Sequence, residues 1–212
     1  RGGLGSSPDE QQAERLQARA DVLTKLGSLA ARGRGAVWSA SLDHARAQVA
    51  LAERIRALTV SAATAASSPA AGGGLTEADR PLALARQFLA NRLLAMGQAD
   101  AALSAARDAH VVLERLGAGE GASGAARIEA VTAAAVHAEA LLLADRSGEA
   151  RSLLQAAWQR LQDMVARDPQ NLMLRGRLAQ MGRRLAAAQS ASGDPAATVR
   201  TMEAVLAASA DF

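Results

Sequence analysis

The stretch GQADAALSAARDAHVVLERL, residues 97–116, decides the fold because its residue spacing returns twice farther along the chain. The same spacing appears in DRSGEARSLLQAAWQRL at residues 145–161 and in GDPAATVRTMEAVL at residues 193–206. Successive copies lie 48 residues apart, and the matching pairs are Ala102 and Ala109, Ala150 and Ala157, and Thr198 and Val205. Self-similarity with a period of this size is typical of stacked helical hairpins. We therefore expect a repeat protein in which each hairpin packs on the next.

The composition supports helices throughout the chain. Half of the 212 residues are apolar, yet only 2% are aromatic, and alanine supplies much of the apolar fraction. Alanine has the highest helix propensity and lets neighbouring helices approach closely. A β-sandwich or barrel would need more bulky interior residues, so the composition predicts an all-α fold.

Helix start and stop signals divide the chain into eight helices in four antiparallel hairpins. Residues 1–7 are expected to be a disordered start, and residues 8–66 an N-terminal hairpin. A Gly-, Ser- and Pro-rich segment at residues 67–75 predicts a flexible linker. Residues 76–212 are expected to hold the other three hairpins, with helix starts at Thr76, near residue 98, near residue 125, after a Ser147–Gly148 turn, at Asp168–Pro169 and at Asp194–Pro195.

Apolar residues recur at steps of three and four along these segments, which indicates one buried face on each helix. Trp158 is expected to pack between neighbouring hairpins and to fill the volume that alanine leaves open. The residues predicted to face inward are Leu42, Ala45, Val49, Ala52, Ile55, Leu82, Ala85, Leu89, Leu93, Met96, Ala102, Ala106, Ala109, Leu113, Leu116, Ala150, Leu154, Ala157, Trp158, Leu161, Val165, Leu174, Leu178, Met181, Leu185, Val199, Met202 and Leu206.

Several classes of function are disfavoured by the sequence. The net charge of +3 is modest and the basic residues are dispersed among acids, so we expect no nucleic-acid partner. No apolar run approaches the roughly 20 residues of a membrane span, so we expect no direct membrane insertion. The glycine-rich stretches at 72–74 and 117–124 lack the context of a phosphate loop, and no G-x-S-x-G elbow is present. We expect no enzyme, no cofactor and no metal.

The chain contains three histidines, His44, His110 and His137. His110 and His137 fall on consecutive predicted helices, so they could in principle approach each other and bind a metal. We expect them to be partly buried or surface histidines rather than a ligand pair. A catalytic or small-ligand helical bundle would need a cluster of convergent polar groups around them.

The chain resembles the tetratricopeptide repeat family, which places a turn before a second helix with small residues at set positions. Gly97, Ala102 and Ala109 match that spacing, as do Asp145, Ala150 and Ala157, and more loosely Gly193, Thr198 and Val205. Ala40, Ala45 and Ala52 resemble a degenerate first copy, and Asp168–Pro169–Gln170–Asn171 resembles the punctuation between repeats. The family period is about 34 residues, so the helices or loops here must be longer. Alanine and leucine replace most of the family's large aromatic contacts.

The resemblance implies a right-handed α-solenoid whose first helices line a groove. By analogy with the family, the exposed lining consists of Gln87, Asn91, Glu139, Gln180 and Arg183. Asn91 lies where the family often keeps an asparagine that contacts the ligand backbone. Gln87 occupies the place of the basic residue that would hold a peptide carboxylate, so the resemblance implies an extended or helical peptide instead.

The long-period form resembles repeat arrays appended to bacterial signalling proteins, including receptor-type serine/threonine kinases and winged-helix regulators. We therefore expect a non-catalytic docking or sensing domain of a larger protein, which binds a protein or peptide. We expect it to be an extracytoplasmic part of a membrane-anchored parent, with a cytoplasmic domain as the alternative. A second hypothesis is a structural module that forms a homodimer through terminal faces, because the ending VLAASADF carries Val205, Leu206 and Phe212 without a polar cap.

Overall fold

The computed structural model describes residues 37–66 and 79–209. These ranges contain seven α-helices and no strand, so this part of the chain is all-α. The helices are α2 (Val37–Ala66), α3 (Arg80–Ala95), α4 (Ala99–Ala118), α5 (Gly124–Leu143), α6 (Ser147–Arg167), α7 (Leu172–Ala191) and α8 (Pro195–Ser209). The expected disordered start, the first expected helix and the expected linker at 67–75 lie outside the described residues.

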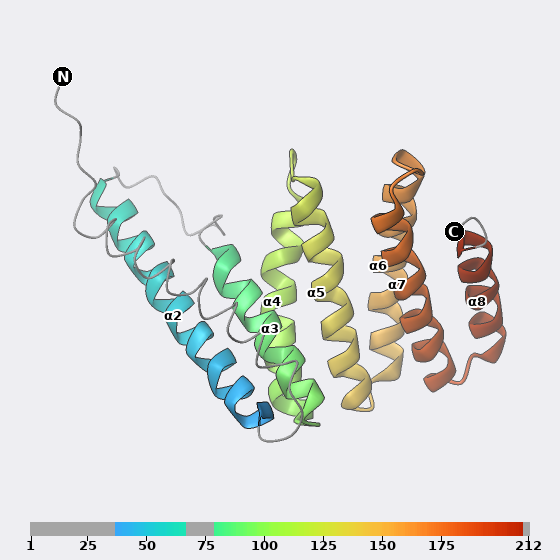
Figure 1. Ribbon diagram of the computed structural model, residues 1–212, viewed down its shortest axis with the longest axis horizontal. Helices are drawn as coiled ribbons and strands as arrows, with labels where there is room; N and C mark the ends of the chain where they lie inside the picture. The colour runs from blue at the N-terminus through green and yellow to red at the C-terminus, as the bar shows by residue number, and fades with distance from the viewer. Residues whose placement is uncertain (1–36, 67–78, 210–212) are drawn as a thin grey trace.

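The helices pack side by side in chain order (Figure 1). Each described helix contacts the one before and the one after it, and α2 and α8 lie at opposite ends of the row. In addition, α3 contacts α5 and α5 contacts α7. The first helices of the pairs α3–α4, α5–α6 and α7–α8 therefore form one continuous layer.

The 48-residue period of the sequence is present in the backbone. Gly97, Asp145 and Gly193 end the first helix of each pair with φ angles of 68°, 58° and 78°. At each turn the next residue's N–H donates to a carbonyl five residues earlier, with N···O distances of 3.0, 2.8 and 2.9 Å. This hydrogen bond, together with a left-handed residue, defines the Schellman motif. The three hairpins therefore turn in the same way at equivalent positions.

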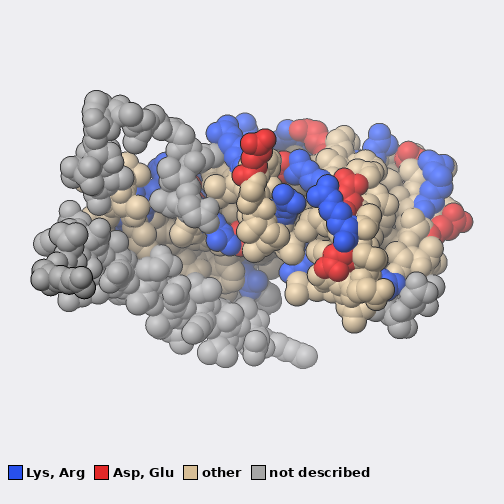
Figure 2. Space-filling model, turned by 90° about the horizontal axis from the view of Figure 1, so that it is seen from above, with Lys and Arg blue, Asp and Glu red and all other residues tan. Residues whose placement is uncertain are grey.

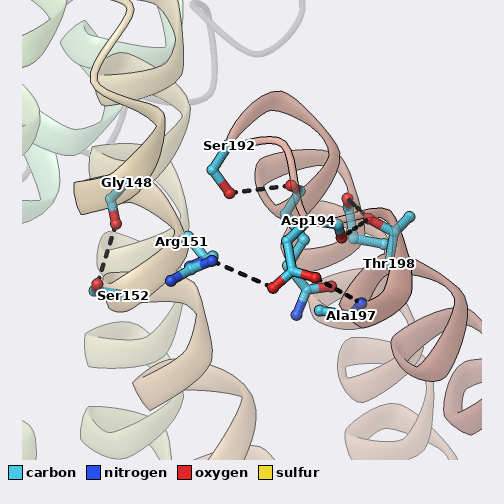
Figure 3. Close-up of polar contacts among 9 residues, drawn as sticks. Gly148, Arg151, Ser152, Ser192, Asp194, Ala197 and Thr198 are labelled. Atoms are coloured by element: carbon cyan, nitrogen blue, oxygen red, sulfur yellow. Dashed lines mark hydrogen bonds and ion pairs between the residues drawn. The ribbon is translucent and has the colours of Figure 1, made fainter.

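The third of these turns also contacts the preceding hairpin (Figure 3). The Asp194 carboxylate accepts a hydrogen bond from the Ala197 N–H at 2.9 Å, which caps α8 as expected. Its other oxygen lies 3.5 Å from Nη1 of Arg151 on α6. One side chain thus starts α8 and pairs with α6.

Alanine residues are fully buried between the helices, as the composition predicts. Ala90, Ala102, Ala138 and Ala150 have no exposed surface. The largest apolar cluster spans α5 to α8 and includes Trp158. Gly182 on α7 lies against the Trp158 ring and Val205, so tightly that a Cβ there would overlap both. The prediction that Trp158 packs between neighbouring hairpins is confirmed.

Burial confirms most of the predicted inward faces, but three residues on them are exposed. Met96 is 38% exposed because it is the C-cap of α3, and Val199 and Leu206 on α8 are 57% and 66% exposed. Val205, which we expected at an exposed end, is 3% exposed. Apolar residues occur on two faces of α8. Their spacing alone therefore could not tell the buried face from the exposed face, and the predicted inward face is the exposed one. The face turned inward carries Val205, the position equivalent to Ala157 on α6.

Several helix boundaries also differ from the expected ones. Asp79 is the N-cap of α3, whereas Thr76 lies outside the described residues. The turn before α6 is at Asp145, and Ser147–Gly148 already belongs to the helix. Asn171, not Asp168, caps α7: its side chain accepts a hydrogen bond from the Leu174 N–H at 3.2 Å.

Candidate partner groove

A cavity of about 200 Å³ opens on the layer formed by α3, α5 and α7. We call this cavity the groove. Its lining residues are Asn91 from α3, Ile128, Val131, Thr132 and Val136 from α5, Leu161 from α6, and Arg177, Gln180, Met181 and Arg184 from α7. The first helices of all three pairs therefore contribute to it.

The groove combines an apolar floor with polar groups that can hydrogen-bond a ligand. Val131, Leu161 and Met181 are each at most 5% exposed and belong to the main core cluster. The amides of Asn91 and Gln180 each offer both donors and acceptors. Such a mixture of buried apolar surface and a few polar groups is typical of binding sites.

Two arginines of α7 supply the positive charge of the groove. Arg184 donates through Nε to Oε1 of Glu139 at 2.5 Å, so this charge is already paired. Nη1 of Arg177 lies 3.5 Å from the Thr132 hydroxyl, and its Nε is buried without a hydrogen-bond partner. The positive charge of Arg177 is therefore held over the groove by packing and by one long contact to Thr132.

The structure brings together only some of the residues that the family analogy named. Asn91 and Gln180 line the groove, and Glu139 pairs with Arg184, which lines it too. Gln87 is half-buried on α3, and its Oε1 is buried without a partner. Arg183 is exposed and is not a lining residue of the groove.

Sequence reasoning missed Arg177 and Arg184. The signal was present, because they lie three residues before and four residues after Gln180, which places all three on one helical face. Arg183 lies one residue from Arg184 and therefore about 100° around the helix.

Two other cavities of about 350 Å³ each lie between neighbouring helices. In the one between α2, α3 and α4, Arg86 already pairs with Glu53 at 3.3 Å and with Asp108 at 3.5 Å. In the one between α4, α5 and α6, Arg160 is held by two 2.5 Å contacts to Glu114. The groove is the better candidate site because the first helices of three consecutive pairs contribute to it.

Basic and acidic side chains are interspersed where the described residues are visible in Figure 2. Ion pairs between helices account for part of the interspersed charge, for example Arg80 on α3 with Glu129 on α5 at 2.6 Å. In the described ranges, none of the helices is long and apolar enough to cross a membrane.

Comparison of the chain with protein-family models finds no match, and comparison with curated proteins finds none either. The function must therefore be argued from the geometry of the groove and from the repeat.

Proposed function

We propose that this chain is a non-catalytic protein–protein interaction domain of a larger bacterial signalling protein. In this proposal it binds a peptide or a partner surface in the groove. The observation that carries it is the groove itself: polar groups over an apolar floor, supplied by the first helices of three consecutive hairpins. A peptide lying across these helices would meet equivalent surfaces in succession.

The proposed architecture is a right-handed tetratricopeptide-like α-solenoid of about four hairpins. Two observations support it. Neighbouring helices pack in chain order, and the turns at Gly97, Asp145 and Gly193 share one conformation at a 48-residue spacing. The eighth helix of the proposal is the first helix of the expected N-terminal hairpin, which lies outside the described residues.

The proposal predicts which groups of the groove a ligand would use. Arg177 offers the terminal N–H groups of its guanidinium, and Gln180 offers its amide on the same face. Backbone carbonyls of a peptide are acceptors of the required kind. The floor residues would cover one or two apolar side chains of the peptide.

The test is to select peptides on the full chain from a displayed random library and to measure their Kd by fluorescence anisotropy. We expect Arg177→Ala to weaken binding at least tenfold, since truncation of a hot-spot arginine costs about 2 kcal/mol or more and about 1.4 kcal/mol corresponds to tenfold in Kd. Arg183→Ala is the matched control, because it removes an exposed arginine of the same helix outside the groove. If no peptide is enriched, or if both variants bind as well as the unaltered chain, the groove is not the site.

A second candidate function is self-association through the outer face of α8. Val199 and Leu206 are 57% and 66% exposed on this face. Leu206 lies 48 residues after Trp158, the residue with which α6 packs on Gly182 of α7. Trp158 faces α7 in the intact fold, so Leu206 at the equivalent position of α8 faces the side where a further helix would pack.

Static light scattering over a concentration series distinguishes this candidate from the first. Self-association predicts a dimer that Leu206→Glu converts to a monomer, because a charge in an apolar interface is not solvated. Arg200→Gln is the control, because Arg200 is exposed on the same helix about 100° around from Val199 and therefore off this face. A monomer at every concentration would exclude this candidate and leave the groove proposal unaffected.

A further inference from the structure

His110 on α4 and His137 on α5 face each other across the contact between two hairpins. Their Nδ1 atoms are 3.3 Å apart, and the ring centroids are 5.3 Å apart with the planes tilted by 48°. The His110 side chain is 15% exposed. Both imidazoles are therefore held in place by the packing of α4 on α5.

The distance between the two nitrogens fits a shared metal ion. Zn²⁺ binds imidazole nitrogen at about 2.0–2.1 Å in tetrahedral geometry, and two such ligands are then roughly 3.3 Å apart. We propose that His110 and His137 bind one late first-row divalent cation, of which Zn²⁺ is the example, through their Nδ1 atoms. Imidazole suits zinc, copper and nickel better than it suits magnesium or calcium.

Glu114 places a negative charge near the second ring nitrogen of His110. It lies one helical turn after His110, and its Oε2 is 3.8 Å from Nε2 of that histidine. A carboxylate near the second ring nitrogen favours a proton there and leaves Nδ1 free to bind a metal. Sequence reasoning missed this carboxylate at the i+4 position.

The histidines are also in the protonation state that metal binding needs. Burial lowers the pKa of both, and the pKa of His137 falls to about 4, with further contributions from the charges of His110, Arg107 and Arg146. Neutral imidazole is the form that binds a metal. At 3.3 Å one ring can donate its Nδ1–H to the other Nδ1. For both Nδ1 atoms to bind the ion, the donating ring takes the tautomer with its proton on Nε2, so neither ring has a net loss of a proton.

Two of the nearby positive charges are compensated by carboxylates. Arg160 is paired with Glu114, and Arg146 is paired with Glu149 at 2.7 Å. Within the described residues there is no group of three or more His, Asp or Glu side chains that could hold a metal. The protein therefore supplies two ligands, and water completes the coordination. The ion would link the α3–α4 hairpin to the α5–α6 hairpin.

The test is a calorimetric titration of Zn²⁺ into the full chain after treatment with a chelator and dialysis. We expect one equivalent to bind, and His110→Asn and His137→Asn each to weaken binding at least tenfold. His44→Asn is the matched control on α2 and should bind Zn²⁺ as well as the unaltered chain. Glu114→Gln should weaken binding less than His110→Asn does, because Glu114 acts on His110 through its charge at 3.8 Å and not as a ligand.

Circular dichroism verifies that each variant is folded. A measurement on the unaltered chain needs no variant: Zn²⁺ should shift the Nδ1 resonances of His110 and His137 in ¹⁵N spectra of the imidazole rings. The proposal is overturned if the unaltered chain binds no Zn²⁺, if His110→Asn and His137→Asn bind it equally well, or if neither Nδ1 resonance moves.

Discussion

Gly182 is the residue at which α6, α7 and α8 come closest together. Because a Cβ at this position would overlap the Trp158 ring and Val205, Gly182→Ala should force both side chains to move. Overpacking of this kind costs about 1–3 kcal/mol of unfolding free energy. Urea denaturation followed by circular dichroism measures the change.

The control for this prediction is Gly176→Ala on the same helix. No atom lies within 4 Å of a Cβ added at Gly176. Alanine is favoured over glycine in a helix by about 1 kcal/mol, so this variant should be as stable as the unaltered chain or more stable. Equal effects of the two substitutions would contradict the close packing at Gly182.

Asp145 has a left-handed backbone conformation, and the equivalent positions in the other two turns, Gly97 and Gly193, are glycines. Its φ is 58°, whereas Gly97 and Gly193 have φ angles of 68° and 78°. A side chain in this region is strained by roughly 1 kcal/mol. We therefore expect Asp145→Gly to raise the free energy of unfolding, and Gly97→Ala to lower it. Thermal unfolding of both variants checks this, and a lower melting temperature for Asp145→Gly would be evidence against the turn conformation.

His137 makes the stability of the fold dependent on pH. Its pKa in the folded chain is lowered to about 4, mainly by burial, while the unfolded chain titrates near 6.5. Between these values the unfolded state binds more protons, so the free energy of unfolding falls as the pH drops from about 6.5 to about 4. His110 acts in the same direction.

Urea denaturation in EDTA at a series of pH values measures this dependence. We expect a loss on the order of 1–2 kcal/mol once solvent screening of the half-buried rings is allowed for. The His110→Gln, His137→Gln double variant should lose less over the same range. If the free energy of unfolding of the double variant depends on pH as steeply as that of the unaltered chain, other groups cause the effect. Glu114, whose pKa is lowered by its hydrogen bond to Arg160, is one of them at the low end of the pH range.

Among the features of single helices, the capping residues were predicted least accurately from the sequence. Asp168–Pro169 has the signature of a helix start, yet Asp168 is the C-cap of α6, and Asn171 caps α7. The Asn171 amide also donates to the Asp168 carboxylate at 2.9 Å. Two polar residues three positions apart can each cap a helix, and the local sequence alone cannot decide which one does.

This cap gives a prediction for α7. Asn171→Ala removes the acceptor of the Leu174 N–H and should cost about 1 kcal/mol of unfolding free energy. Gln170→Ala, an exposed change in the preceding turn, is the control. Chemical denaturation of both variants tests the assignment, and a larger loss for Gln170→Ala would overturn it.

Helix faces were predictable where one stripe of apolar residues stands out. On α7 all four predicted residues, Leu174, Leu178, Met181 and Leu185, are buried. On α8 the prediction of Val199 and Leu206 was wrong, because apolar residues also occur at Val205 on the inward face. The 48-residue match of Val205 to Ala157 indicated the correct face better than the local periodicity did.

At the scale of the whole molecule, the groove depends on which helices meet. The family analogy selected Asn91 and Gln180, which line the groove, from positions along single helices. Arg177 joins them because α5 and α7 are in contact, which brings it to Thr132, 45 residues earlier in the chain. Such a pairing of side chains from different hairpins follows from packing and not from local spacing.

The packing of each hairpin on the next makes a prediction about truncation. A chain that ends at Asp168 lacks α7 and α8, so it should expose Leu154, Trp158 and Leu161, which are at most 6% exposed in the intact fold. An apolar surface of this kind promotes association. Light scattering should therefore detect aggregation, and Trp158→Gln in the shortened chain should reduce it.

The same truncation tests how stability is distributed along the row of helices. If each hairpin depends mainly on its neighbours, amide resonances of α3 and α4 should keep their positions in the shortened, Trp158→Gln chain, while those of α6 move. Loss of the α3 and α4 resonances would mean that folding is cooperative across the whole row. The shortened chain could instead stay monomeric and be as stable as the full chain. In that case the contact between α6 and α7 contributes little to stability, and the packing of Trp158 on Gly182 does not hold the hairpins together.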